Sequence, residues 1–369
     1  MSLNRFRKSG GRIDYWILFF VFALCIFGLL MIYSSSAVIS FEQYGINNYY
    51  FKKQLISLGI GLVCLVITSS IDYRFWQKYA TIFFVIALVL LIWVILFSSK
   101  ISGAQRWIQL GPIPLQPSEI MKLASIIYLA AWFAKQKEQI KNFKHGFVPF
   151  IIILGLISFL IMKQPDMGTT SVVVGIAVVM FFCAGAPWWQ MGLGLAGITG
   201  IFLLLIKAAP YRMQRLMVFL NPASDTLGTG YHITQAMLAI GSGGWFGLGF
   251  GQSKQKYLYL PEPHTDSIFA ITTEELGFLR AMLIFVVFIL IVVRGLKIAK
   301  NAPDQFSRLL AVGIIAWIII QFFVNIGAMI GMLPLTGVPL PFVSYGGTSL
   351  VILLASVGIL LNISKQAHR

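Results

Sequence analysis

Charged residues are scarce in this sequence. Asp, Glu, Lys and Arg make up 11% of its 369 residues, whereas hydrophobic residues make up 58%. Soluble globular domains carry about 25% charged residues, so the scarcity excludes an ordinary soluble domain. The composition instead indicates an integral membrane protein.

Cysteine is also rare. The three cysteines, Cys25, Cys64 and Cys183, all lie inside apolar runs, where a thiol usually behaves as a small core residue. Their number and spacing exclude a disulfide framework and a cysteine-ligated metal site. The chain has only four histidines, and we expect neither haem nor a fixed set of metal ligands.

Acidic residues are the third shortage. Twelve Asp and Glu stand against 28 Lys and Arg, which gives a formal net charge of +16. Such a balance can indicate nucleic-acid binding, but the placement of the basic residues argues against a nucleic acid partner. If the N-terminus is cytoplasmic, the positive-inside rule accounts for sixteen of them on short cytoplasmic segments: Arg5, Arg7, Lys8, Arg12, Arg74, Lys78, Lys135, Lys137, Lys141, Lys144, Arg294, Lys297, Lys300, Arg308, Lys365 and Arg369.

Long apolar runs, by contrast, are abundant. They predict an all-α integral membrane protein of about ten transmembrane helices, in one polytopic domain that covers residues 1–369. Runs near the length that spans a bilayer occur at 14–33, 54–71, 79–98, 117–134, 147–162, 168–186, 189–207, 267–293, 309–333 and 346–363.

The first apolar run has a second interpretation, a cleaved signal peptide. Basic residues precede it and small residues follow it at 34–37. Its apolar core is longer than the roughly 7–15 residues of a signal peptide. We therefore expect a retained membrane anchor.

One connection is long. Residues 207–265, between the seventh and eighth predicted helices, form a predicted extracytoplasmic loop. The apolar and aromatic stretches WFGLGF and YLYL argue against disorder, so we expect a re-entrant segment or a short interfacial helix. The glycines at 239–252 lack the flanking strand and helix of a nucleotide-binding motif. We attribute them to tight turns and close backbone packing, and expect no nucleotide.

Three carboxylates stand at the start of the eighth apolar run. Asp266, Glu274 and Glu275 would each be costly as ionised groups in hydrocarbon. On one helix, Glu274 lies about 80° around from Asp266 and about 12 Å deeper, whereas Glu275 lies nearly opposite. Asp266 and Glu274 can then face one internal cavity, and Glu275 needs another partner. Helix capping is the simpler role for Asp266, because Pro263 places the helix start nearby.

Basic residues on the predicted outer face form a second group of candidates. Arg106 precedes the fourth apolar run, Arg212 and Arg215 begin the long loop, and Lys256 lies near its end. Guanidinium and ammonium groups bind phosphate, so these residues can hold a pyrophosphate. Contact with anionic lipid headgroups is the alternative.

Charged pairs also precede other apolar runs. Glu119 and Lys122 lie three residues apart and share a helix face. They form either a local ion pair or part of an anion site. Asp166 immediately precedes the sixth run, where we expect it to cap the helix.

Prolines and glycines interrupt the last two apolar runs. The segment 331–350, which contains Ser344, predicts a broken, polar-lined re-entry at the outer face. Gln321 and Asn325 in the preceding run are placed to form hydrogen bonds across helices.

Six motifs taken together resemble the SEDS family, the shape, elongation, division and sporulation proteins. They are QPSEIMKLA, QPDMGTT, YRMQRLMVFLNP, GYHITQAMLAIGSGGWFGLGFGQSKQK, YLPEPHTDSIFAITTEELGF and GVPLPFVSYGGTSL. The match runs nearly end to end, with the motifs in the family's order, and the combination is highly specific. QSKQKYLYLPEPHTD is more similar to the division branch of the family, and LTGVPLPF to the elongation branch.

The resemblance implies a peptidoglycan glycosyltransferase that polymerises lipid II at the outer face of the bacterial cytoplasmic membrane, with both termini in the cytoplasm. The family's catalytic aspartate falls on Asp266, within His264-Thr265-Asp266, and its paired Glu/Lys motif falls on Glu119 and Lys122. A divalent cation, Mg²⁺ or Mn²⁺, is implied. So are a class B penicillin-binding protein as transpeptidase partner and other division or elongation membrane proteins.

Two positions depart from the family pattern. Ser267 stands where the family usually has phenylalanine, and Arg280 stands where a glycine is common. Because Arg280 falls in the middle of an apolar run, we expect it to have an interior partner.

The expected mechanism uses Asp266 as general base toward a sugar hydroxyl. Cations stabilise the departing pyrophosphate, with Lys122, Arg212, Arg215, Lys256 and Arg106 as candidates and Glu119, His264, Thr265, Glu274 and Ser344 in support. Two alternatives are a lipid II flippase and a glycan hydrolase. A hydrolase would use two carboxylates such as Glu262 and Asp266, and no long sugar groove is evident for it.

Overall fold

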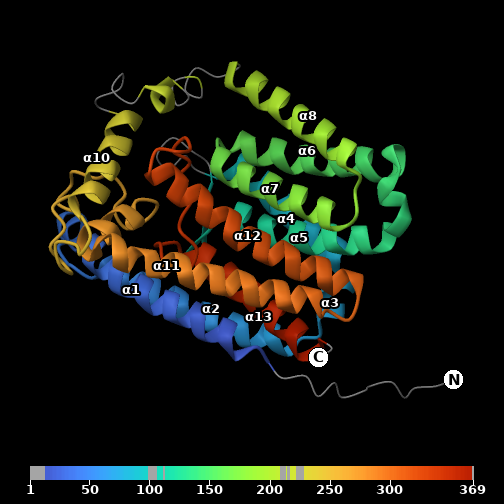
Figure 1. Ribbon diagram of the computed structural model, residues 1–369, viewed down its shortest axis with the longest axis horizontal. Helices are drawn as coiled ribbons and strands as arrows, with labels where there is room; N and C mark the ends of the chain where they lie inside the picture. The colour runs from blue at the N-terminus through green and yellow to red at the C-terminus, as the bar shows by residue number, and fades with distance from the viewer. Residues whose placement is uncertain are drawn as a thin grey trace.

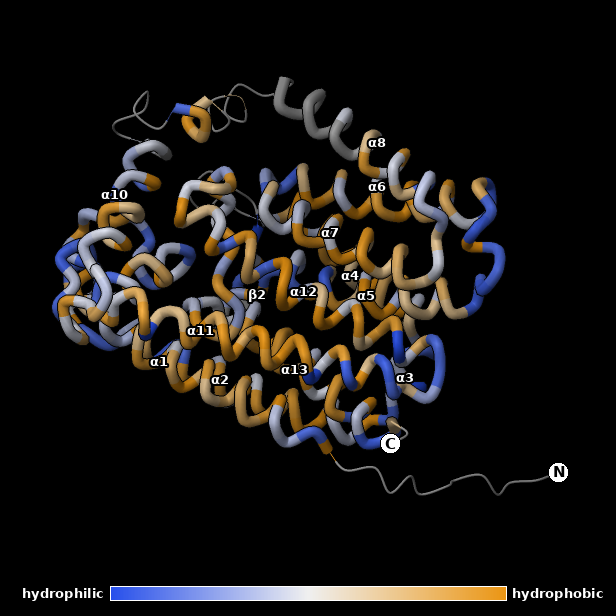
Figure 2. Tube along the Cα trace, viewed as in Figure 1, coloured by the Kyte–Doolittle hydropathy of each residue, from blue (hydrophilic) through white to orange (hydrophobic). Residues whose placement is uncertain are grey.

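The computed structural model describes residues 13–98, 106–110, 113–207, 213, 217–221 and 228–367. Most of these residues are helical, and the centres of the helices are apolar while the connections at their ends are polar (Figure 2). This pattern is the one expected of helices that cross a bilayer.

The helices follow the predicted apolar runs, and each of the ten runs falls largely on one of them. Within the described part of the chain, seven helical stretches are long and apolar enough to cross a membrane: α1, α2, α4, α11, α12, α13 and the continuous stretch Phe143–Lys163. The all-α membrane fold is therefore confirmed, whereas the count of ten spans stays a prediction. The helices of the described residues are α1 (Tyr15–Tyr44), α2 (Tyr49–Ser70), α3 (Tyr73–Lys78), α4 (Ala80–Phe97), α5 (Pro117–Gln136), η1 (Lys137–Lys141), η2 (Phe143–Phe147), α6 (Val148–Lys163), α7 (Met167–Cys183), α8 (Trp188–Lys207), α10 (Thr229–Ser242), α11 (Ile268–Lys300), α12 (Gln305–Met329) and α13 (Gly347–Gln366).

Helices α12 and α13 form the centre of the bundle (Figure 1). Helix α13 packs along α2, and α12 packs against α5, α7 and α11. Both central helices are apolar on all sides and buried along most of their length, as expected for helices surrounded by others. Outer helices such as α4 instead expose large apolar side chains, which face lipid in a membrane protein.

Helix α1 is longer than its apolar run predicts. Asp14 begins it by accepting hydrogen bonds from the backbone of Trp16 and Ile17. It ends at Gly45, whose φ of 70° suits a helix C-terminus. The serines at 34–36 lie inside the helix and are buried, so the helix continues where hydropathy falls.

Helix α11 is broken near its start. Gly277 has φ 80° and ψ 170°, which is not helical, and the break leaves backbone groups without helical partners. The segment 244–249 supplies hydrogen-bond partners for these backbone groups. Leu248 N donates to Glu274 O at 3.0 Å, and Phe278 N donates to Gly244 O at 2.9 Å. A Cβ at Gly247 or Gly277 would overlap the other segment's backbone. Close backbone packing therefore accounts for both glycines, as predicted for Gly247.

A short β-hairpin that was not predicted from the sequence connects α4 to α5. Strands β1 (Ile108–Leu110) and β2 (Ile113–Leu115) pair antiparallel, with Ile108 opposite Leu115. Thr348 at the start of α13 donates to the carbonyl of Pro114 at 2.6 Å. The hairpin is thereby attached to the centre of the bundle.

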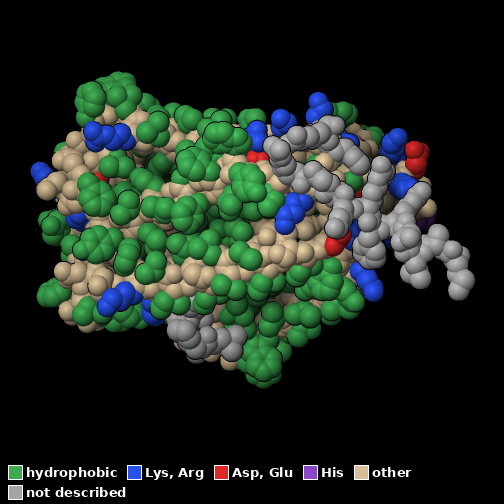
Figure 3. Space-filling model, turned by 90° about the horizontal axis from the view of Figure 1, so that it is seen from below, with side chains coloured by type: hydrophobic (Ala, Val, Ile, Leu, Met, Phe, Trp, Pro, Cys, Tyr) green, Lys and Arg blue, Asp and Glu red, His purple; other side chains and the backbone are tan. Residues whose placement is uncertain are grey.

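The bundle has two distinct ends (Figure 1). One, the α10 end, carries α10 and the break in α11. The other, the C-terminal end, carries α3, η1, the turn between α11 and α12, and the end of α13. The described basic residues that the positive-inside rule assigned to the cytoplasm lie on these segments, on η2, on the ends of α5 and α11, or at the start of α12. Between the ends, apolar side chains cover much of the surface in the view of Figure 3.

Candidate active site

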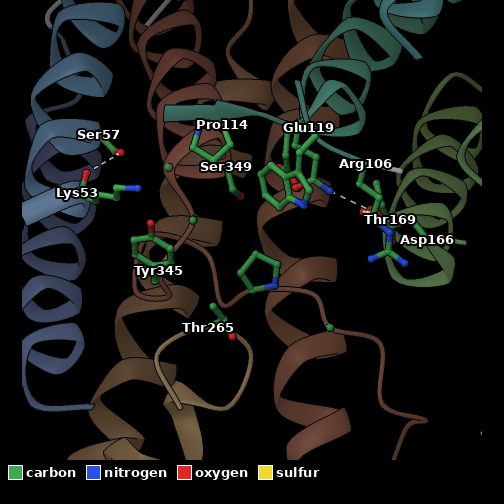
Figure 4. A pocket seen from close by; sticks show the side chains of 16 residues that line it. Lys53, Ser57, Arg106, Pro114, Glu119, Asp166, Thr169, Thr265, Tyr345 and Ser349 are labelled. Atoms are coloured by element: carbon green, nitrogen blue, oxygen red, sulfur yellow. Dashed lines mark hydrogen bonds between the residues drawn. The ribbon is translucent and has the colours of Figure 1, made fainter. Parts of the chain in front are cut away.

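A cavity of about 200 Å³ lies where α2, the hairpin, α5, α7 and the segment before α13 meet (Figure 4). Its walls combine charged, polar and proline residues from segments far apart in the sequence. They are Lys53, Ser57, Arg106, Trp107, Pro114, Gln116, Glu119, Asp166, Thr169, Thr265, Gly337, Pro339, Tyr345, Gly346, Gly347 and Ser349.

Two basic side chains stand on opposite sides of this cavity, Lys53 and Arg106 (Figure 4). Arg106 was predicted to bind an anion. Its guanidinium donates to the carbonyl of Gln164 at 2.8 Å and to that of Pro165, which fixes its orientation. Lys53 was missed. It lies one turn into α2, with its ammonium 4.6 Å from the ring of Tyr49. The two cations are of the residue types that can pair with phosphate oxygens.

Glu119 and Lys122 form a buried ion pair at one wall. Lys122 Nζ lies 2.8 Å from Glu119 Oε1 and donates to Gln321 Oε1 at 3.0 Å. It also lies 5.1 Å from the ring of Trp317. Glu119 lines the cavity but Lys122 does not. The second oxygen of Glu119, Oε2, is buried without a hydrogen-bond partner among the described residues.

Asp166 caps α7, as predicted. Its carboxylate accepts from Thr169 N and from Thr169 Oγ1, both at 2.9 Å, and Gln116 Nε2 approaches it at 3.5 Å. Asp166 therefore supports the cavity wall with its oxygens already committed to hydrogen bonds.

Asp266 lies directly behind the wall formed by Thr265 and Gly337. Thr265 Oγ1 lies 3.2 Å from Asp266 Oδ1 and 3.0 Å from Glu262 Oε2, and a Cβ placed on Gly337 would be 3.9 Å from Asp266 Oδ2. Helix α11 begins only at Ile268 with Ser267 as its N-cap, so Asp266 is not the capping residue. Asn325 holds it from α12, donating to the carbonyl of Asp266 at 2.8 Å.

Burial raises the pKa of Asp266 to about 7, with a further contribution from the negative charge of Glu262. A carboxyl with a pKa near neutrality can accept a proton effectively at physiological pH. Burial lowers the pKa of His264 to about 4, so that imidazole is neutral. His264 packs 4.1 Å from the ring of Tyr50 and 5.4 Å from that of Tyr345.

Ser344 organises the turn beside the cavity. Its hydroxyl accepts from Leu340 N at 2.7 Å, and its carbonyl accepts from Gln54 Nε2 at 3.2 Å. The same Gln54 side chain accepts from Gly346 N. Ser344 thus positions the cavity-lining residues that follow it without lining the cavity itself.

Glu274 and Lys256 are not brought to the cavity. Glu274 accepts from Ser253 Oγ at 2.5 Å and from Lys254 N at 3.0 Å, so it holds the preceding loop. Lys256 is paired with Glu275 at 3.0 Å, and both contact Ser34 of α1. Glu275 therefore has the separate partner that its helix position predicted.

Three arginines that the sequence singled out are not part of the cavity lining formed by the described residues. Arg212 and Arg215 lie outside the described residues. Arg280 is exposed and donates to the carbonyl of Phe246 at 3.2 Å. The expectation of an interior partner for Arg280 is wrong, because its side chain is exposed and donates to a backbone carbonyl of the loop that precedes α11.

Among the described residues no three Asp, Glu, His or Cys side chains gather as a metal site. What the arrangement offers is a proton acceptor behind one wall and two cations on facing walls. Such a set can activate a hydroxyl and stabilise an anionic leaving group.

Known proteins match this chain over nearly all of its length. The model of a cell cycle protein family, FtsW/RodA/SpoVE, matches residues 15–369. Stage V sporulation protein E of Bacillus subtilis is 43% identical over 358 residues, which cover 96% of this chain and 98% of that protein. A probable peptidoglycan glycosyltransferase FtsW of Trichlorobacter lovleyi is 40% identical, covering 95% of this chain and 93% of the relative.

Two solved structures are also similar. One chain comes from a study of how a peptidoglycan synthase complex coordinates polymerization and crosslinking, with a TM-score of 0.79 and 25% identity over 95% of this chain and 97% of that chain. The rod shape determining protein RodA of Thermus thermophilus has a TM-score of 0.71 and 26% identity over 97% of this chain and 98% of that chain. The chain therefore belongs to the FtsW/RodA/SpoVE family of cell cycle proteins, the family that its motifs resemble.

Proposed function

We propose that this protein is a peptidoglycan glycosyltransferase that polymerises lipid II into glycan strands, for cell division or elongation. Relatives named as FtsW glycosyltransferases support the reaction class. The observation that carries the proposal is the carboxyl of Asp266, with its raised pKa, behind a cavity that has Lys53 and Arg106 on its walls.

The proposed orientation follows from charge. The basic residues of α3, η1 and the α11–α12 turn lie at the C-terminal end of the bundle, which the positive-inside rule assigns to the cytoplasm. Both termini are then cytoplasmic. The α10 end lies outside, and the cavity opens toward the outer leaflet of the bacterial cytoplasmic membrane.

The donor must then carry its own leaving group, because nucleotide sugars are not available outside the cell. A lipid-linked pyrophosphate meets this requirement. Lys53 and Arg106 would hold its phosphates, since ammonium and guanidinium groups pair with phosphate oxygens. Negative charge grows on the pyrophosphate as the sugar departs, so the same two cations stabilise the transition state more than the ground state.

Asp266 would act as the general base. Its ionised carboxylate takes the proton from the 4-hydroxyl of the acceptor's N-acetylglucosamine. The freed oxygen attacks the anomeric carbon of the donor's N-acetylmuramic acid, and the bond to the pyrophosphate breaks with inversion from α to β. General-base assistance of this kind is typically worth about 10²–10⁴ in rate.

A divalent cation, Mg²⁺ or Mn²⁺, fits this cavity as a substrate-bound ion. Mg²⁺ is usually bound by one or two carboxylates together with substrate phosphates. Glu119 offers one such oxygen, because its buried Oε2 has no hydrogen-bond partner among the described residues. When bound, the ion would neutralise pyrophosphate charge. Lys122 holds the other oxygen of Glu119 at 2.8 Å and so keeps Oε2 directed away from the ion pair.

A class B penicillin-binding protein is the proposed partner. The similar chain from a complex that coordinates polymerization and crosslinking supports this pairing. The partner would supply the transpeptidase that crosslinks the new strands. Other division or elongation membrane proteins complete the proposed set.

Reconstitution tests the function. The purified protein should convert lipid II into glycan strands that separate by length on a gel, with higher yield when its cognate class B penicillin-binding protein is present. To test the flippase alternative, the movement of fluorescent lipid II between the leaflets of proteoliposomes is measured alongside strand formation. Movement of lipid II between leaflets without strand growth would contradict the proposal.

A further inference from the structure

His232 of α10 and Ser267 at the start of α11 meet beside Asp266. His232 Nε2 lies 2.6 Å from Ser267 Oγ, and Ser267 Oγ donates to the carbonyl of Pro261 at 2.9 Å. Ser267 is fully buried and His232 nearly so. The cavity lining described above includes neither side chain, so this contact is separate from the proposed substrate-binding surface.

The two hydrogen bonds fix the direction of donation. A serine hydroxyl has a single proton, and here that proton points to the carbonyl of Pro261. His232 Nε2 must then carry a proton and donate to the serine oxygen. The result is a chain of hydrogen bonds that runs from His232 of α10, through Ser267, to Pro261, at the two ends of the loop 261–267 that contains Asp266.

That loop requires external support. Glu262 has φ 49°, a left-handed conformation that non-glycine residues seldom adopt. Its carbonyl accepts from Thr265 N at 3.2 Å and from Ser267 N at 3.4 Å. Strained backbone of this kind persists where surrounding contacts over-determine it. On the α12 side, Asn325 holds the carbonyl of Asp266 at 2.8 Å; on the α10 side, His232 holds the adjacent Ser267.

We propose that His232 and Ser267 are positioning residues for Asp266. Together they tie the loop to α10 and hold the Asp266 carboxyl in the place where it meets the acceptor hydroxyl. Neither touches the reacting atoms. The inference rests on the proposed role of Asp266 as base. It adds that the position of the Asp266 carboxyl depends on the contact from α10.

Single substitutions and their combination test the inference in the full-length protein with its partner. His232→Leu and Ser267→Ala should each lower kcat about 10- to 100-fold, because small misplacements of a reacting group cost about that much. KM for lipid II should stay within about twofold. The double variant should be no slower than the slower single variant, because both changes break one chain of hydrogen bonds.

Two further variants separate positioning from folding. His232→Gln places an amide N–H at the position of Nε2 and should restore most of the rate. Thr234→Ala changes an exposed residue of α10 whose hydroxyl donates only to Gly230 O at 2.8 Å, and should leave the rate unchanged. Ser267→Ala removes only one oxygen atom and so disturbs the packing little. If His232→Leu does not fold, the kcat of Ser267→Ala alone tests the inference.

Unchanged kcat in Ser267→Ala, or independent losses that multiply in the double variant, would overturn the inference. So would a loss that His232→Gln does not restore. Asp266→Asn distinguishes this failure from failure of the proposed base. If that variant is inactive while the His232 and Ser267 variants are fully active, only the positioning role is lost.

Discussion

At the scale of single residues, the account depends on the environment of one carboxyl. Asp266 is buried, faces the negative charge of Glu262, and has its pKa raised to about 7. Its position was predictable from a motif, but its surroundings were not. The predicted helical rotation from Asp266 to Glu274 assumed one continuous helix, but the helix begins only at Ile268. The two carboxylates therefore do not share a cavity.

The pKa of Asp266 predicts the pH dependence of the reaction. The base must be ionised, so kcat/KM should rise as pH increases through about 7 and level off above it. Glu262→Gln removes a charge that raises the pKa of Asp266, so the rise should move to lower pH. A pH–rate profile of both proteins measures this. An unchanged midpoint in Glu262→Gln would argue against the assignment.

Lys53 shows what the sequence could not reveal at this scale. In the sequence it is one of two adjacent lysines before an apolar run, where basic residues commonly face lipid headgroups. Only the fold places it across the cavity from Arg106. The signal that identifies it is the convergence of α2 with the hairpin, and no local pattern carries that information.

At the scale of elements, the break in α11 shapes the α10 end. Gly277 ends the first nine residues of the helix, and the segment 244–249 forms hydrogen bonds with the backbone groups that the break leaves unpaired. Glu275 with Lys256, and Glu274 with Ser253, then fasten the same loop to α11. The carboxylates that looked costly in an apolar helix are satisfied because the loop folds onto the break.

Gly277→Ala should destabilise the protein by more than about 3 kcal/mol. A Cβ there would overlap the backbone of Gly247, and the φ of 80° with ψ of 170° is nearly restricted to glycine. Gly241→Ala is the matched control. That glycine lies within α10 with nothing near its added Cβ, so alanine should be neutral or slightly stabilising. The midpoints of thermal unfolding in detergent compare the two variants. Equal midpoints would contradict the requirement for glycine at the break in α11.

Elements differed in how well their sequences predicted them. Long apolar runs marked the helices because each must present about twenty apolar residues to lipid. The hairpin at 108–115 escaped prediction because strands of three residues show too little alternation to be recognised. The end of α1 was placed too early because hydropathy falls at serines that pack inside the bundle.

At the scale of the whole molecule, charge divides the two ends of the bundle. The C-terminal end carries the basic segments of α3, η1 and the α11–α12 turn, and the α10 end carries the long loop. The family and the all-α membrane fold were predictable because the motifs and apolar runs extend along the chain. The side on which the cavity opens remains a proposal from the positive-inside rule.

Cysteine labelling tests that orientation. After Cys25, Cys64 and Cys183 are replaced by alanine, single cysteines are placed at the exposed positions Lys254 and Lys141. In intact spheroplasts a membrane-impermeant maleimide should label Lys254→Cys and spare Lys141→Cys, while lysed membranes should label both. Labelling of Lys141→Cys alone before lysis would reverse the proposed topology.

Polymerisation of lipid II by Asp266→Asn protein is the most direct test of the central claim. The variant should fold at least as well as the natural protein. A carboxyl whose pKa rises from 3.8 to about 7 on folding destabilises the folded state progressively as pH increases through that range. At pH values above about 7, replacing the charged carboxylate by an amide removes a destabilisation of the folded state of up to about 4 kcal/mol. The folded variant should form no glycan strands with its partner present, whereas strand formation near the natural rate would contradict Asp266 as the base.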